Sequence, residues 1–128
     1  MIPLVLLPGM MCDARLFAPQ TAALSGRWII HHAPIGGQAT MQDLAAEILA
    51  HAPPRFALAG VSMGGFASIA FGSLVPGAHA VSINPQTTLD TDIVPWETRY
   101  ENGRRQDWTL PLGDAAALTK GFERVNIF

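Results

Sequence analysis

The chain has 128 residues, 49% of them hydrophobic, and a formal net charge of −2, which predicts one domain with a substantial apolar core. This charge gives no electrostatic reason to expect nucleic acid or a membrane as a partner, and the apolar run near the start is too short to span a bilayer. Cys12 is the one cysteine, so an intrachain disulfide is excluded. The pattern of a signal peptide is not found, and we expect a cytoplasmic protein.

Short apolar runs alternate with helical patterns along the chain. In chain order they predict a strand at residues 3–7, a helix at 13–24, a strand at 28–33, a helix at 40–52, a strand at 55–61, a helix at 63–74 and a strand at 78–83. Residues 87–113 mix charges with prolines and glycines, which indicates a loop-rich segment with room for one short helix. A helix at residues 114–120, capped by Asp114, and a strand at residues 124–128 follow.

Polar and helix-breaking residues mark several of these boundaries. Asp13 is suited to cap the first helix. Thr40, with Asp43 three positions later, resembles a capping box at the start of the second helix. Pro34 and Gly36-Gly37 are expected to end the second strand.

Strands that alternate with helices pair in parallel through right-handed crossovers. We therefore predict an α/β fold of three layers, α/β/α, around a mostly parallel sheet of about five strands. Residues 1–86 are expected to form the core of the domain. Residues 87–128 are expected to add a cap-like excursion, a helix and the last strand to the same domain.

The segment Gly60-Val61-Ser62-Met63-Gly64 matches the G-x-S-x-G pattern of a nucleophile elbow. The pentapeptide alone is a weak signal, but an apolar strand leads into it and a helix rich in small residues follows. Glycines two positions before and after the serine keep Cβ atoms out of the crowded turn, and the Met63 N–H then points at a developing oxyanion. The alternative is an ordinary strand-to-helix turn with a capping serine.

The sequence LVLLPGMM at residues 4–11, followed by AGVSMGG at residues 59–65, resembles the N-terminal portion of the α/β-hydrolase family, in particular small bacterial serine esterases. The resemblance implies a truncated α/β-hydrolase fold with Ser62 as nucleophile and with no cofactor or metal. It also implies that the loop after the first strand supplies a second oxyanion N–H, from Met10 rather than Met11. The family often has histidine where this chain has Pro8, and apolar packing is the alternative role for both methionines.

In that family the triad continues with an acid and a late histidine, but no histidine follows His79. We therefore expect the triad to be incomplete within the chain. His79 and His51 are expected at the opposite edge of the sheet from Ser62. His32 is the one candidate base, although its strand is two places away, about 10 Å by strand spacing. A half-buried strand histidine is the alternative interpretation.

The remaining candidates rest on position alone. Side chains expected to line a substrate pocket are Met11, Gln86 and Trp96, with Trp108 as a further candidate. Asp90 and Asp92 stand where some family members carry the acid, but without a histidine they are interpreted as loop residues. Cys12 is interpreted as packing beside the oxyanion loop rather than as a thiol nucleophile.

Two functional hypotheses follow. The first is an esterase-like or lipase-like hydrolase that forms an acyl-enzyme on Ser62 and prefers uncharged esters. The second is a catalytically incomplete fragment or a non-catalytic binding or assembly module, favoured by the missing late histidine. The expected partners are a small-molecule ester and a second copy of the chain, because a five-stranded sheet leaves an edge open to pairing.

Overall fold

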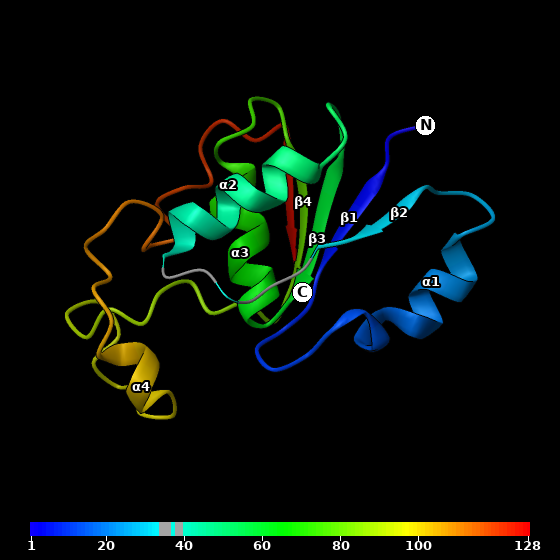
Figure 1. Cartoon of the computed structure of the whole chain (residues 1–128). Helices are drawn as coiled ribbons and strands as arrows, with labels where there is room; N and C mark the ends of the chain where they lie inside the picture. The colour runs from blue at the N-terminus through cyan, green and yellow to red at the C-terminus, as the bar shows by residue number, and fades with distance from the viewer. Residues whose placement is uncertain (34–36, 38–39) are drawn as a thin grey trace.

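Five parallel strands form the centre of the molecule, as the computed structural model shows for residues 1–33, 37 and 40–128 (Figure 1). The strands are β1 (Leu4–Leu7), β2 (Ile30–His32), β3 (Ala57–Val61), β4 (His79–Ile83) and β5 (Arg124–Ile127). Their order in the sheet is β2-β1-β3-β4-β5. Every neighbouring pair is parallel, so the predicted α/β class is confirmed.

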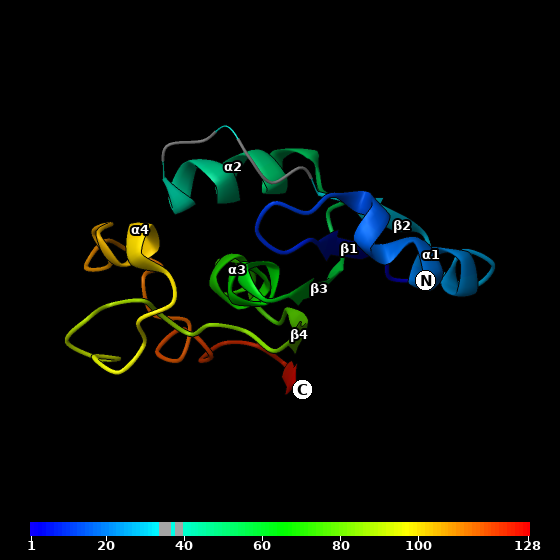
Figure 2. The same ribbon diagram turned by 90° about the horizontal axis from the view of Figure 1, so that it is seen from below.

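Helices lie on both faces of this sheet. They are the 3-10 helix η1 (Ala14–Phe17) and the α-helices α1 (Ala18–Leu24), α2 (Met41–His51), α3 (Met63–Gly72) and α4 (Glu101–Arg104). Figure 2 shows α1 on one side of the strands and α2 and α3 on the other. The three-layer arrangement follows from the strand order, because the connection from β1 to β2 runs in the opposite direction across the sheet from the later crossovers.

The caps predicted at Thr40 and Asp13 are present. Thr40 Oγ1 accepts a hydrogen bond from the Asp43 N–H at 3.1 Å and donates to Asp43 Oδ2 at 2.8 Å. The Asp13 side chain accepts from the Arg15 N–H, although the segment behind it begins as a 3-10 turn before α1 continues it. Pro34 and Gly36, expected to end the second strand, lie outside the described residues.

The core lies between the sheet and the pair α2 and α3. All residues of α3 from Gly64 to Gly72 are buried, and three of its glycines contact other segments closely. The largest buried side chains in this layer are Leu7, Leu58, Phe66, Ile69 and Phe71. The small residues after Ser62 let α3 lie directly on β3 and β4, which fixes the position of its first turn.

The helix predicted at residues 114–120 is wrong. Hydrogen bonds run from the Ala117 N–H to the Asp114 carbonyl at 3.2 Å and from the Leu118 N–H to the Ala115 carbonyl at 3.1 Å, which is the spacing of isolated turns. The Ala115 N–H donates instead to the Thr87 carbonyl at 2.7 Å and Ala115 is fully buried, so contacts with a distant segment override the local helical pattern. The one short helix expected between residues 87 and 113 is present as α4.

Among the described residues, no helix is both long enough and apolar enough to cross a membrane.

Candidate active site

Ser62 occupies a strained turn between β3 and α3. Its backbone has φ 57° and ψ −120°, a region that residues with a side chain rarely adopt. The flanking glycines are required by sterics: a Cβ on Gly60 would lie 2.0 Å from the Gly64 carbonyl oxygen, and one on Gly64 would lie 2.0 Å from the Leu7 carbonyl oxygen. The turn is therefore tightly packed, as expected for an elbow. The Ser62 side chain makes no capping hydrogen bond to α3, so Ser62 does not act as an ordinary capping serine.

The loop after β1 lies beside this turn. A Cβ built on Gly9 would be 3.5 Å from the Ser62 Cβ, so the backbone of the loop passes next to the serine. The Cys12 N–H donates to the Gly9 carbonyl at 3.1 Å and closes a β-turn, with Met11 at φ 60° in its third position. Within the described residues, no backbone hydrogen bond occupies the N–H of Met10 or Met63.

The Ser62 hydroxyl has a polar partner in the segment that follows β4. Ser62 Oγ donates to Gln86 Oε1 at 3.3 Å, and Gln86 Nε2 donates to the Tyr100 hydroxyl at 3.2 Å. The sequence indicated Gln86 as a pocket residue, and the structure brings it to the serine itself. Tyr100 was not anticipated, because nothing in the sequence relates it to Ser62, from which it is separated by 37 intervening positions.

Two buried serines support the turn from behind. The Gly65 carbonyl accepts hydrogen bonds from Ser68 Oγ at 2.8 Å and Ser82 Oγ at 2.9 Å, and the two hydroxyls are 2.7 Å apart. The Ser62 N–H also donates to the Ile83 carbonyl at 2.9 Å. These bonds satisfy the buried polar groups and hold the first turn of α3 against β4.

An apolar cavity of about 360 Å³ opens beside the two residues expected to form an oxyanion hole. Met10 and Met63 contribute to its wall, together with apolar residues of α2 and of the segment after α4: Met41, Leu44, Trp108, Leu110 and Pro111. Gln42 Nε2 donates to the Pro111 carbonyl at 2.7 Å and ties these two parts of the wall together. The Trp108 ring stands edge-on to Phe66, with the centroids 5.7 Å apart.

Asp107 places one carboxylate on this wall. Hydrogen bonds from the side chain and then the backbone N–H of Thr109 lower the pKa of Asp107 below its ordinary value. At neutral pH the carboxylate is therefore ionised, and the cavity combines apolar walls with one negative charge.

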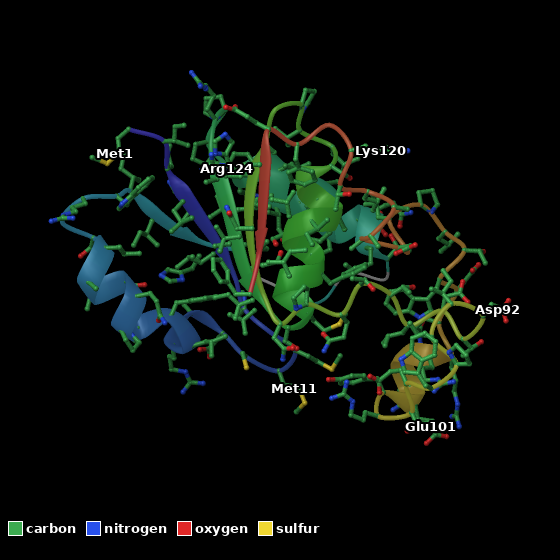
Figure 3. The ribbon with its side chains drawn as sticks, turned by 180° about the vertical axis from the view of Figure 1, so that it is seen from behind. Met1, Met11, Asp92, Glu101, Lys120 and Arg124 are labelled. Atoms are coloured by element: carbon green, nitrogen blue, oxygen red, sulfur yellow. The ribbon has the colours of Figure 1, made fainter. Side chains whose placement is uncertain are left out.

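Two of the expected pocket residues lie elsewhere. The Met11 side chain is fully exposed and projects outward from its loop (Figure 3). Trp96 is 75% exposed and does not contribute to the cavity, whereas Trp108 does. Trp96 follows Pro95 in a turn on the surface of the excursion, while Trp108 is drawn inward because its indole N–H donates to the Gly103 carbonyl at 2.7 Å.

His32 is not brought to Ser62. Its Nε2 lies 3.2 Å from Thr21 Oγ1, and its ring is 6.4 Å from that of Phe17, so it packs against η1 and α1. The Nδ1 atom of His32 is buried without a hydrogen-bond partner among the described residues. The strand order confirms that β2 is separated from β3 by β1. The geometry therefore favours the half-buried strand histidine over the base.

The other histidines also contact groups other than Ser62. His51 Nδ1 lies 2.8 Å from the Glu47 carbonyl at the end of α2, and His79 Nε2 lies 3.0 Å from Glu123 at the start of β4. His31 contributes to a second cavity between β2 and α2. The hydrogen bond and ion pair of His51 and His79 are thus made away from the elbow, as the sequence predicted.

Among residues 1–33, 37 and 40–128, no group of three or more histidines, cysteines or carboxylates is placed to hold a metal ion. A scan against models of protein families finds none that matches this chain. No curated protein compared with the chain matches it significantly. The site is therefore interpreted from its own geometry.

Proposed function

We propose that the protein is a serine hydrolase of the α/β-hydrolase type that cleaves carboxylic esters through an acyl-enzyme on Ser62. The observation that carries this proposal is the strained backbone of Ser62, at φ 57° and ψ −120°, between a strand and a helix and against the Gly9 loop. Strain of about 1–3 kcal/mol persists in a fold only when the surroundings enforce it, and it is concentrated at functional sites. An ordinary capped turn has no need of this conformation.

In the proposed reaction, Ser62 Oγ attacks the carbonyl carbon of the ester while its proton passes to a general base. The negative charge that develops on the carbonyl oxygen is stabilised by the N–H groups of Met63 and Met10, to which no backbone group of the described residues is hydrogen-bonded. The intermediate then expels the alcohol, which takes up the proton. Water hydrolyses the acyl-enzyme by the same steps and restores the hydroxyl.

The base is the part of this mechanism that the described residues do not supply. Gln86, the hydrogen-bond acceptor of Ser62, carries a neutral carboxamide that does not take a proton at neutral pH. We propose that an imidazole from another protein segment, such as a second copy of the chain, completes the site. Free imidazole at about tens of millimolar is then expected to raise the rate of ester hydrolysis by the wild type but not by Ser62→Ala. The Ser62→Ala reaction also measures the direct attack of imidazole on the ester, which is subtracted.

A fluorophosphonate probe tests the nucleophile directly. Ser62 Oγ bonds to phosphorus, fluoride leaves and the serine proton passes to solvent, so intact mass should rise by one phosphonyl group in the wild type. Ser62→Ala should show no such increase. Equal modification of both proteins would end the proposal that Ser62 is the nucleophile.

A non-catalytic binding module is the second candidate. It is favoured by one observation: the Ser62 hydroxyl is bonded to a carboxamide, and the His32, His51 and His79 rings each contact other groups. A folded wild type that the fluorophosphonate does not modify would support the module over the enzyme.

The cavity beside Met10 and Met63 is proposed to take an uncharged apolar substituent of the ester, because its one charge is the Asp107 carboxylate. Asp107→Asn is expected to raise kcat/KM for an ester whose acyl chain ends in a carboxylate, relative to a neutral ester of equal length, by about 2- to 5-fold. The two p-nitrophenyl esters are compared in one assay. Asp92→Asn, the same change on an exposed turn, is the control, and an equal effect of both variants would exclude a local role for Asp107.

A further inference from the structure

A chain of hydrogen bonds connects the elbow to the excursion that carries α4. It runs from Ser62 through Gln86, three residues after β4, to Tyr100, the residue before α4. All three side chains are half-buried. Segments that are far apart in the sequence are thus joined at the one hydroxyl that the proposed reaction uses.

The donors and acceptors in this series of hydrogen bonds determine the direction in which the Ser62 O–H bond points. A carboxamide has an acceptor oxygen on one side and a donor NH2 group on the other. A partner that binds the NH2 group therefore leaves the oxygen facing the opposite neighbour. Because Gln86 Nε2 donates to the Tyr100 hydroxyl, Gln86 Oε1 faces Ser62 and accepts its proton in a hydrogen bond. A proton held in this direction is turned toward a group that cannot remove it.

We propose that Gln86 and Tyr100 form a latch that holds the Ser62 hydroxyl in a resting state, with Gln86 as the positioning residue and Tyr100 acting through it. This inference rests on the proposed function, since it concerns the reactivity of the same serine. The Ser62 to Gln86 hydrogen bond must break before Ser62 can pass its proton to a base. The segment that carries Tyr100 thereby influences the reactivity of the nucleophile, in addition to supplying part of the cavity wall.

The latch predicts that its removal accelerates the reaction of Ser62. Gln86→Ala and Tyr100→Phe are each expected to raise the second-order rate of fluorophosphonate modification by about 2- to 10-fold, the range that corresponds to one ordinary hydrogen bond. The double variant should react no faster than Gln86→Ala alone, because Tyr100 has no route to Ser62 without the carboxamide. Additive effects, or slower reaction in both single variants, would overturn the latch.

Gln86→Glu adds a readout that a purely structural role would not change. The carboxylate keeps the shape of the side chain but can accept the serine proton, so the modification rate should rise as pH increases through the pKa of the new carboxyl group. Gln20→Glu, the same substitution on the exposed side of α1, should leave the pH profile unchanged. A Gln86→Glu profile identical to that of the wild type would count against the assigned contact.

The outcomes separate the two proposals. If circular dichroism shows every variant folded and none is modified, the proposed function fails and the latch fails with it. If the wild type is modified at Ser62 but Tyr100→Phe has the same effect with and without Gln86, the hydrolase proposal stands and only the latch is overturned.

Discussion

Replacing Gly64 with alanine is expected to destabilise the fold by about 3–5 kcal/mol, or to prevent folding altogether. The added Cβ would lie 2.0 Å from the Leu7 carbonyl oxygen and 2.5 Å from the Pro8 carbonyl oxygen. Both atoms belong to the backbone where β1 ends, so neither can move aside without breaking the sheet beside the elbow. The measurement is the free energy of unfolding from urea titration followed by circular dichroism.

Gly26→Ala is the matched control for this prediction. A Cβ at Gly26 meets no atom within 4 Å, and the residue does not have a positive φ. The substitution should leave stability unchanged or increase it by up to about 1 kcal/mol, because alanine restricts the unfolded chain. Similar losses in both variants would show that the close approach at Gly64 is not what limits stability.

Ser62→Gly is expected to stabilise the protein by about 1–2 kcal/mol relative to Ser62→Ala, while both variants lose the reactive hydroxyl. Alanine keeps the Cβ and therefore the strain at φ 57°, whereas glycine adopts this conformation freely. Both variants lose the bond to Gln86 equally, so their difference in unfolding free energy isolates the backbone. Glycine also gains entropy in the unfolded chain, which makes the expected difference a lower bound on the strain.

The reverse order of stability, with Ser62→Ala the more stable variant, would contradict the strain. It would then follow that the turn accommodates a side chain at this position without cost, and the main observation behind the hydrolase proposal would be lost. The comparison needs no substrate, so it tests the geometry independently of any activity.

The strands and the order of elements could be predicted because their signals are local. The capping box at Thr40 and the apolar runs that became β1, β3 and β4 depend on neighbouring residues only, and the structure confirms each of them. The tight turn at Ser62 could be predicted for the same reason, because its closest backbone approaches fall at Gly60 and Gly64, two positions on either side of the serine.

The walls of the cavity could not be predicted, because they depend on contacts between distant segments. Trp96 and Trp108 both lie in the loop-rich segment, but Trp108 is held inward by its indole bond to the Gly103 carbonyl and by its contact with Phe66. The spacing of Met41 and Leu44 predicted a buried face of the helix, but it did not predict which segment this face contacts. The helix prediction after Asp114 failed for a related reason, since the local pattern is helical while the Ala115 N–H bonds to the distant Thr87 carbonyl.

The burial of α3 from Gly64 to Gly72 has a consequence for how the molecule fluctuates. Phe122 lies close to Gly72 and Trp108 packs on Phe66, and every residue of the helix after Met63 is buried. Its amide protons should exchange with deuterium only when the whole domain opens, later than those of α1, which has no buried residue. Ser62 thus precedes the helix that is expected to unfold last. A local movement of the segment that carries α4 can therefore expose Ser62 while α3 and the sheet keep their structure.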